Sequence, residues 1–285
     1  MQAAAIAHGW CAKLDLVLER GHRGRTRLAR NRHQGPLCVQ RPFYPDPDGR
    51  AHVYLIHAPG GVVGGDSLET RVVLRERARA LLTTPAATKF YRSPVSVSRL
   101  KQDFQVEADA ILEWLPQETI LFDGSNSELA TRVELAPGAR FAGWEILCLG
   151  RTASGEHFDR GVLRQSFEIW RAGVPLLVER LRLDARDSLQ HTNAGLAGQP
   201  VLGVFALVLG SRQAEAQALL DRVRAKMPEL RIDEHFSITA LRDLLVCRYL
   251  GPRAESARRC FERAWSILRP ALLDAEARAP RVWAT

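Results

Sequence analysis

The stretch HAPGGVVGGD places His57 and Asp66 on either side of four glycines. It follows the apolar run Val53–Ile56, so it begins where a strand is expected to end. Glycine adopts backbone conformations that other residues avoid, so both polar side chains can face one small site. The loop lacks the Gly-Lys-Ser/Thr ending of a P-loop and the spacing of a dinucleotide fingerprint. The alternative interpretation is a purely structural turn between buried strands.

Further carboxylates stand beside apolar or glycine-rich sequence, namely Glu113, Asp123 and Glu156. Together with Asp66 and the histidines they supply oxygen and nitrogen ligands for a transiently bound divalent metal. Their spacing is too irregular for a permanent metal cage, and each could instead be exposed or paired with an arginine. The sequence contains no Gly-x-Ser-x-Gly and no His-Glu-x-x-His motif.

An enzymatic alternative is a β-sandwich carbohydrate-active hydrolase that uses Asp66 and Glu156 as paired carboxylates. Such a pair must lie roughly 5–10 Å apart in an open cleft. The sequence offers few aromatic residues in exposed positions for stacking on sugars, which counts against this alternative.

The segment Thr83–Arg92 runs from small and hydroxylated residues into Lys-Phe-Tyr-Arg. Two aromatic residues between two cations are typical of an interface anchor, so Phe90, Tyr91 and Arg92 are predicted to contact a partner. The alternative is a capped turn with both aromatic rings in the core.

The composition is that of a globular protein with a net charge of +8. Only four of the forty basic residues are lysines, and arginine favours bidentate contacts with carboxylates, so an acidic protein partner is expected. Nucleic acid is not an expected partner, because the one dense basic run, Arg20–Arg32, has no interleaved aromatic residues. That run is predicted to be a solvated turn.

Several features predict a cytoplasmic protein that does not enter a membrane. No apolar run approaches the ~18 residues of a membrane span, and the Ala-rich start has no basic region of a secretory signal. The five cysteines are widely spaced without a Cys-x-x-Cys, which predicts small buried hydrophobic residues in a reducing compartment.

The first two thirds of the chain are predicted to be β-structure. Ala12–Leu18 alternates between apolar and polar residues, and hairpins are predicted around Pro137-Gly138 and Ala172–Pro175. Many short strands with few helices favour a sandwich, a barrel or a solenoid. Because no fixed repeat is present, periodicity alone does not select the solenoid.

The last third changes character, although no linker separates it. Helices are predicted over Arg212–Lys226, capped by Ser211, and over Pro252–Leu268, ended by Pro270. Both are amphipathic and cover either the protein's own sheet or a partner. We expect a single domain, residues 1–285, with a β-rich body (10–200) and a C-terminal strand–helix block (201–285).

Five motifs, in order, closely resemble the urease accessory protein UreD family, called UreH in some bacteria. They are HAPGGVVGGD (His57–Asp66), LLTTPAATKFYRS (Leu81–Ser93), LEWLPQETILF (Leu112–Phe122), YLGPR (Tyr249–Arg253) and PRVWAT (Pro280–Thr285). The resemblance runs from about Trp10 to Thr285. One departure is Ala58, where the family often has a second proline.

The resemblance implies a mainly β fold, with two stacked sheets in β-helix-like winding, a few helices and a C-terminal α/β block. It implies a non-enzymatic assembly factor that binds apo-urease and recruits UreF, which brings the GTPase UreG. The complex supports nickel delivery, with carbon dioxide carbamylating the active-site lysine of urease. No cofactor is expected to bind permanently, and nickel is expected only in transit through a polar internal passage.

We place that passage on Asp66 and Glu156, with His57 and Glu113 as further candidates for transient nickel contact. Contact with UreF is expected from the C-terminal helix, through Phe261 and Trp265. The tail Arg281–Thr285, with Trp283, is expected to contribute to the same contact.

Overall fold

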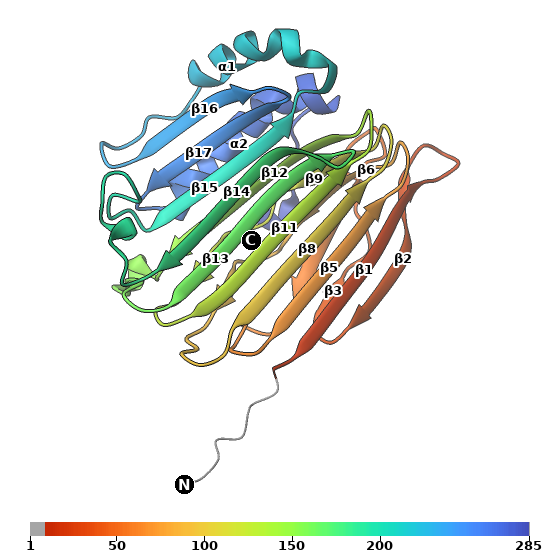
Figure 1. Ribbon diagram of the computed structural model, residues 1–285. Helices are drawn as coiled ribbons and strands as arrows, with labels where there is room; N and C mark the ends of the chain where they lie inside the picture. The colour runs from red at the N-terminus through yellow and green to blue at the C-terminus, as the bar shows by residue number, and fades with distance from the viewer. Residues whose placement is uncertain (1–8, 285) are drawn as a thin grey trace.

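The chain alternates between two stacked sheets as it runs from the N-terminal strands at the right of Figure 1 to the C-terminal strands and helices at the upper left. The computed structural model describes residues 9–284. In the first sheet the strands lie in the order β14-β13-β11-β8-β5-β1-β2. Their bounds are β1 (Cys11–Arg20), β2 (Thr26–Gln34), β5 (Ser67–Leu74), β8 (Ser98–Val106), β11 (Asn126–Leu135), β13 (Val162–Arg171) and β14 (Val174–Asp184).

The second sheet has the order β16-β17-β15-β12-β9-β6-β4-β3, and the short strands β7 and β10 attach beside β12. The bounds of these strands are β3 (Leu37–Val39), β4 (Ala51–His57), β6 (Arg79–Thr83), β7 (Thr88–Phe90), β9 (Ile111–Trp114), β10 (Thr119–Leu121), β12 (Arg140–Leu149), β15 (Val201–Val208), β16 (His235–Leu241) and β17 (Leu244–Gly251).

Four successive pairs of strands make the body a β-solenoid. The pairs β4–β5, β6–β8, β9–β11 and β12–β13 each contribute one strand to either sheet, and neighbouring turns pair in parallel. The prediction of two stacked sheets with β-helix-like winding is therefore confirmed, with about four turns. Hairpins with antiparallel pairing extend the solenoid at both sides, β1–β2 at one and β13–β14 at the other.

Register aligns the inward side chains of the first sheet into rows. One apolar row crosses five strands at Leu16, Val72, Phe104, Val133 and Ile169, all at most 1% exposed. A fully buried side chain of this size contributes about 1.5–3 kcal/mol to stability. The turns therefore need no repeated sequence, because each turn only has to place an apolar residue at the same register position.

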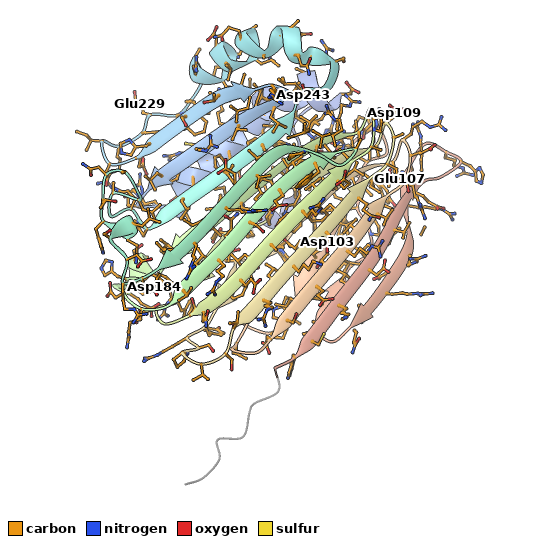
Figure 2. The ribbon with its side chains drawn as sticks, in the orientation of Figure 1. Asp103, Glu107, Asp109, Asp184, Glu229 and Asp243 are labelled. Atoms are coloured by element: carbon orange, nitrogen blue, oxygen red, sulfur yellow. The ribbon has the colours of Figure 1, made fainter. Side chains whose placement is uncertain are left out.

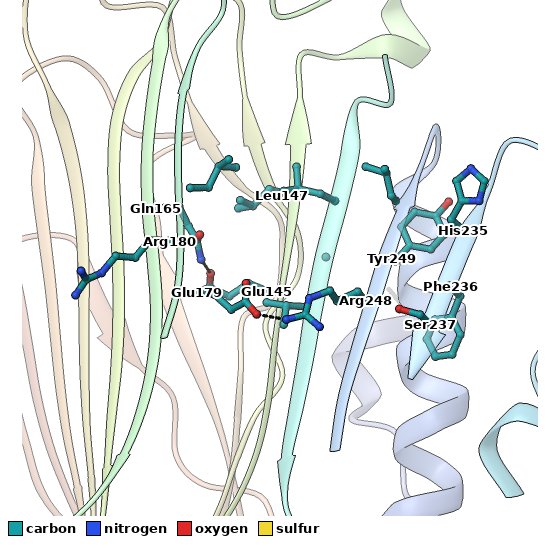
Figure 3. Close-up of a pocket in the computed structure, with 15 residues that line it drawn as sticks. Glu145, Leu147, Gln165, Glu179, Arg180, His235, Phe236, Ser237, Arg248 and Tyr249 are labelled. Carbon is teal, nitrogen blue, oxygen red and sulfur yellow. Dashed lines mark hydrogen bonds and ion pairs between the residues drawn. The ribbon is translucent and has the colours of Figure 1, made fainter. Parts of the chain in front are cut away.

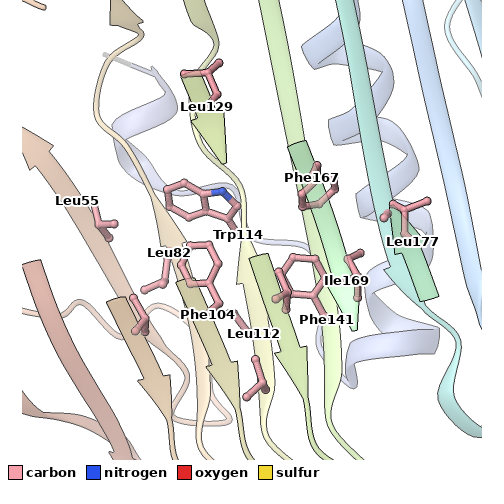
Figure 4. Packing of buried hydrophobic residues seen from close by; sticks show 14 of the residues in the cluster. Leu55, Leu82, Phe104, Leu112, Trp114, Leu129, Phe141, Phe167, Ile169 and Leu177 are labelled. Carbon is pink, nitrogen blue, oxygen red and sulfur yellow. The ribbon is translucent and has the colours of Figure 1, made fainter. Parts of the chain in front are cut away.

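Aromatic rings fill the space between the sheets. Phe104 lies 5.2 Å from Trp114, and Phe141 lies 6.5 Å from Phe167, measured between ring centroids (Figure 4). The alternation predicted for Ala12–Leu18 is confirmed, because its even-numbered side chains all belong to this core.

A second core lies between the second sheet and the helices α1 (Ala216–Arg224) and α2 (Ala254–Leu273). The α2 helix packs on β12, β15 and β17, and buries Phe261 and Leu268 completely. The sequence left open whether the helices cover the protein's own sheet or a partner. The packing shows that they cover the protein's own sheet.

Both predicted helix boundaries need correction. The first α-helix begins at Ala216 rather than Arg212, because Gly210–Glu215 forms a 3-10 segment in which Ser211 makes no capping hydrogen bond. The second continues through Pro270 to Leu273. An interior proline costs roughly 3 kcal/mol, but the turn after it buries Leu272 and Leu273, which offsets that cost.

The outer face of the first sheet carries no helix and is covered by charged side chains, among them Asp103 (Figure 2). Asp103 pairs with Lys101 at 3.2 Å, and Arg99 pairs with Glu128 at 3.2 Å. The run Arg20–Arg32 was predicted to be a solvated turn, but only residues 21–25 form the hairpin turn; from Thr26 onward the run belongs to strand β2.

Cys148, Cys247 and Cys260 are buried as predicted, whereas Cys11 is exposed. No helix in residues 9–284 is long and apolar enough to cross a membrane.

Candidate functional site

Four loops gather at one end of the solenoid. Because the strands of each turn run parallel, β4, β6, β9 and β12 all end there, and the following strands of the first sheet all begin there. The loops are residues 58–66, 84–97, 115–125 and 150–161. They hold most of the polar residues that the sequence singled out.

Asp66 fixes the first of these loops. Its Oδ1 accepts a hydrogen bond from the Trp10 backbone N–H at 2.8 Å, and its Oδ2 accepts one from the Val63 N–H at 3.0 Å. His57 is half-buried, and burial lowers its pKa although the negative charge of Asp66 opposes this. The loop thus brings His57 and Asp66 within electrostatic range, while both carboxylate oxygens are used to hold the turn.

Glu156 lies in the fourth loop and forms an ion pair with Arg151 at 2.7 Å. It also accepts a hydrogen bond from the Asp123 N–H at 3.1 Å. The hydrogen bond from Arg151 is the main reason that the pKa of Glu156 is lowered. Burial raises the pKa of Asp123, but contacts with Arg160 outweigh this and lower it.

The loops of Asp66 and Glu156 precede β5 and β13, which are separated by β8 and β11. Three strand spacings of about 4.8 Å place these loops about 14 Å apart. That exceeds the separation that a glycosidase needs between its two carboxylates. The geometry therefore argues against the paired-carboxylate hydrolase.

Glu113 lies on β9, on the side of the second sheet that α2 covers, and is fully buried. Its Oε1 accepts from Arg50 at 2.6 Å, and its Oε2 accepts from the Trp265 indole at 2.6 Å and from Arg269 at 3.0 Å. Burial raises the pKa of Glu113, but Arg50 and Arg269 outweigh this and lower it. Both carboxylate oxygens of Glu113 thus belong to a buried ion-pair cluster.

The residues expected at partner interfaces divide into buried and surface groups. Phe90, Phe261 and Trp265 are at most 2% exposed and belong to the chain's own core, so they present no surface for a partner. Trp283 is half-buried; its Nε1 donates to Thr83 Oγ1 at 3.0 Å, and it packs on the rings of two other tryptophans.

Tyr91 and Arg92 are the members of this group that reach the surface of the loop end. Tyr91 Oη donates a hydrogen bond to the Gly60 carbonyl at 3.0 Å, which links the second loop to the first. Arg92 is exposed. These two residues therefore lie at the surface, where a residue that anchors a partner is expected.

Cavities run between the two sheets from this loop end. The first, about 280 Å³, is lined by His57, Gly60 and Lys89 among others. It shares Gln102 and Trp114 with a second cavity of about 40 Å³.

The second cavity in turn shares Glu145 and Leu147 with a third, of about 350 Å³. The third reaches the surface beside the exposed residues Arg180 and His235 (Figure 3). Because adjacent cavities share lining residues, the three lie next to one another in a row between the sheets. We call this row of cavities the passage.

Polar side chains mark the middle of the passage. In the first sheet, register aligns Thr70, Gln102 and Thr131 on adjacent strands, and Thr131 Oγ1 donates to Gln102 Oε1 at 3.0 Å. From the second sheet Glu145 projects inward, and Gln165 Nε2 donates to its Oε2 at 2.7 Å (Figure 3). Hydroxyl, amide and carboxyl groups from both sheets thus meet where the second and third cavities join.

Glu145 has no ion-pair partner among residues 9–284, whereas Glu113, Asp123 and Glu156 each pair with an arginine. Burial raises its pKa, and hydrogen bonds with Thr131 and Gln165 oppose this only in part. A carboxyl group without a counter-ion, facing a cavity, is suited to contact a passing cation. Within the described residues, no group of three or more His, Cys, Asp and Glu side chains is arranged to hold a metal ion.

Sequence reasoning did not single out Gln102, Thr131, Glu145 or Gln165. A signal was present in the sequence, since each occupies an inward position of a strand between two inward neighbours that are apolar or glycine. A polar residue at such a position is unusual and points to a cavity or a buried network.

Comparisons with known proteins show similarity over nearly the whole chain. The sequence model of the family described as UreD urease accessory protein matches residues 11–284. The chain is 43% identical over 280 residues to urease accessory protein UreD 2 of Brucella anthropi, covering 98% of this chain and 100% of that protein.

It is 43% identical over 276 residues to urease accessory protein UreD of Methylobacillus flagellatus, covering 97% and 95% of the two chains. The UreD protein of Alkalilimnicola ehrlichii is 44% identical over 286 residues, covering 99% of this chain and 94% of its own.

Proposed function

The chain belongs to the UreD urease accessory protein family, and from this premise we propose that it matures urease as a scaffold through which nickel passes. Proteins of this family are non-enzymatic accessory proteins of urease maturation. In the proposal the chain binds apo-urease and recruits UreF, which brings the GTPase UreG. These partners are the ones that the family resemblance implies.

The passage is the observation that supports a route for nickel within the chain. Its smallest cavity is lined by the oxygen-bearing side chains of Gln102, Thr131 and Glu145, and Gln165 lines the adjoining third cavity. Such groups exchange readily with the water ligands of a divalent cation, and they bind it less firmly than a cage of thiolates and imidazoles. Glu145 supplies the negative charge that favours a cation over an anion. A route for transit needs this combination of selectivity and weak retention.

One mouth of the proposed route is the loop end, where His57 lines the first cavity and Asp66 holds the adjoining turn. Glu156 lies on the fourth loop at the same end, beside Asp123. We propose that Asp66 and Glu156 attract nickel to this end of the molecule. Glu113 has no part in the revised route, because its oxygens are occupied by Arg50, Arg269 and Trp265.

The experiment is co-expression of urease with the accessory proteins, with Glu145→Gln in this chain. The substitution keeps the shape and the hydrogen bond with Gln165 but removes the negative charge. We expect a several-fold loss of nickel in purified urease, while the chain still co-purifies with its partners. The matched control is Glu128→Gln, on the exposed outer face. Wild-type nickel content in the Glu145 variant would contradict the proposal.

The proposed mouth has its own test, the double variant Asp66→Ala and Glu156→Ala. We expect lower nickel loading with assembly retained. Because Asp66 also holds its loop, the circular dichroism and melting temperature of the variant must first match those of the wild type.

For partner contact we propose Tyr91 and Arg92, together with the exposed side of α2 and the tail. Arg92→Ala should weaken co-purification with the partners more than Arg99→Ala, whose arginine already pairs with Glu128. Deletion of Arg281–Thr285 should reduce capture of UreF. Because Trp283 packs on the core, this deletion is informative only alongside a melting curve.

A further inference from the structure

A polar pocket of about 540 Å³ lies at the end of the solenoid opposite the four loops. Its walls come from the β1–β2 hairpin turn, from the loop before β4 and from the segment after α2. Figure 1 shows this hairpin projecting at the upper right. Four of its lining residues are arginines, namely Arg20, Arg23, Arg25 and Arg278.

Three of these arginines have no acidic partner. Within residues 9–284, Arg20, Arg23 and Arg25 form no ion pair and donate no side-chain hydrogen bond. All three are exposed, and Arg25 lies over the Tyr44 ring at 4.5 Å from its centroid. By contrast, Arg27 on the adjoining strand pairs with a glutamate. The hairpin turn therefore directs uncompensated positive charge at one concavity.

Each of the two carboxylates in the pocket is paired with at least one arginine that does not line the pocket. Asp46 accepts from Arg269 at 2.8 Å, and its side chain is only 1% exposed. Asp48 lies 3.0 Å from Arg79 and 3.3 Å from Arg50. None of these three arginines lines the pocket. Arg278 lies 3.9 Å from Asp46, so the field inside the pocket is set mainly by the guanidinium groups of Arg20, Arg23 and Arg25.

Backbone contacts fix the walls relative to one another. The Thr26 N–H donates to the Gly49 carbonyl at 2.9 Å, which joins the hairpin to the loop before β4. Gly49 has a φ of +76°, and a Cβ there would lie 2.8 Å from Arg25 Cα, so this close approach requires glycine. Arg278 Nη1 donates to the Pro45 carbonyl at 3.1 Å, which joins the C-terminal segment to the same loop. The pocket is therefore preorganised.

We propose that this pocket binds a polyphosphate group, either as inorganic pyrophosphate or as the phosphate chain of a nucleotide. Guanidinium forks bind phosphate oxygens bidentately, and four of them around one concavity match a ligand with several negative charges. The volume suits a small molecule. An acidic protein segment would more readily use a broad flat surface such as the outer face of the first sheet. The site is separate from the passage, so the inference goes beyond the proposed function.

Calorimetric titration of the full-length chain with inorganic pyrophosphate, in magnesium-free buffer, tests the proposal. We expect one site, with affinity reduced at least tenfold in the double variant Arg23→Gln and Arg25→Gln. The matched control is Arg164→Gln with Arg182→Gln. These arginines face each other across β13 and β14, are exposed and unpaired within the described chain, and their loss changes net charge equally.

Affinity in the control should stay within twofold of the wild type. Tighter binding of ATP than of pyrophosphate would identify a nucleotide as the source, and equal binding would identify the phosphate chain alone. Absence of pyrophosphate binding, an equal loss in the control, or binding of a polyglutamate peptide in place of pyrophosphate would overturn the proposal.

A measurement on the wild type removes any dependence on how the variants fold. Phenylglyoxal modifies exposed arginines, and mass spectrometry locates the products. Pyrophosphate should protect Arg20, Arg23 and Arg25 and leave Arg164 and Arg182 reactive. Uniform protection, or none, would refute the assignment.

Discussion

Replacing Arg269 by methionine tests whether the buried ion-pair cluster fastens α2 to the solenoid. Arg269 is 0% exposed and lies 2.8 Å from Asp46 and 3.0 Å from Glu113. Methionine fills most of the volume but leaves both carboxylates short of a cation. Arg50 is then the remaining buried arginine near both carboxylates, and it lies 2.6 Å from Glu113 but 3.9 Å from Asp46.

Removing one partner of a buried pair typically costs about 3–5 kcal/mol. A domain is stable by roughly 5–15 kcal/mol, so the loss is a large part of the total. For a chain of this size we expect the melting temperature to fall by on the order of 10 °C. The free energy of unfolding, from urea titration at pH 7, gives the direct measurement.

The matched control is Arg99→Met, whose ion pair with Glu128 spans 3.2 Å between side chains that are about half exposed. Surface pairs contribute about 0–1 kcal/mol, so this variant should unfold almost like the wild type. A loss below about 1 kcal/mol for Arg269→Met would refute the reasoning. Since Glu113 has a lowered pKa in the folded chain, its stabilisation should be complete above pH 4.5 and decline as the pH falls below that value.

Gly61→Ala should destabilise the loop end by about 1–3 kcal/mol, because a Cβ there would lie 2.5 Å from the Tyr91 ring; Gly60→Ala, where a Cβ would meet only Tyr91 Oη at 3.4 Å, should cost about 1 kcal/mol or less in a urea titration. Glu145→Gln should stabilise the chain at pH 8, since burial raises the pKa of Glu145 and wild-type stability therefore falls as the pH rises above 4.5; a variant less stable than wild type at that pH would contradict this. Glu234 has its pKa lowered to about 2, so its contribution should be lost as the pH falls from 4.5 to about 2, and Glu234→Gln should flatten that part of the stability profile.

Strand content and core faces were predictable because alternation is local. The phase of Ala12–Leu18 assigns its inward residues without reference to any other strand. The winding was not predictable from periodicity, because it depends on pairing between strands some 30 residues apart, as in Val72 with Phe104. The family resemblance supplied that part of the prediction. The helix ends failed where tertiary burial of Leu272 and Leu273 outweighed the local effect of Pro270.

The candidate site was likewise predictable only in part. Asp66 and Glu156 stood out because glycine-rich turns surround them, and both prove to be loop residues at one end of the solenoid. Gln102 and Thr131 look unremarkable in isolation and become a polar row only through register. The register between distant strands is set by the completed fold and cannot be read from the sequence of either strand alone.

The buried cluster also has a consequence for biosynthesis. Asp46 and Arg269 are 223 residues apart, so the early part of the chain leaves the ribosome long before its counter-charge is made. Until α2 emerges, the outer side of the second sheet is uncovered and Glu113 lacks one of its two cations. Nascent or truncated chains that end before α2 should therefore be held by chaperones or degraded, and native packing should be completed only once α2 has emerged.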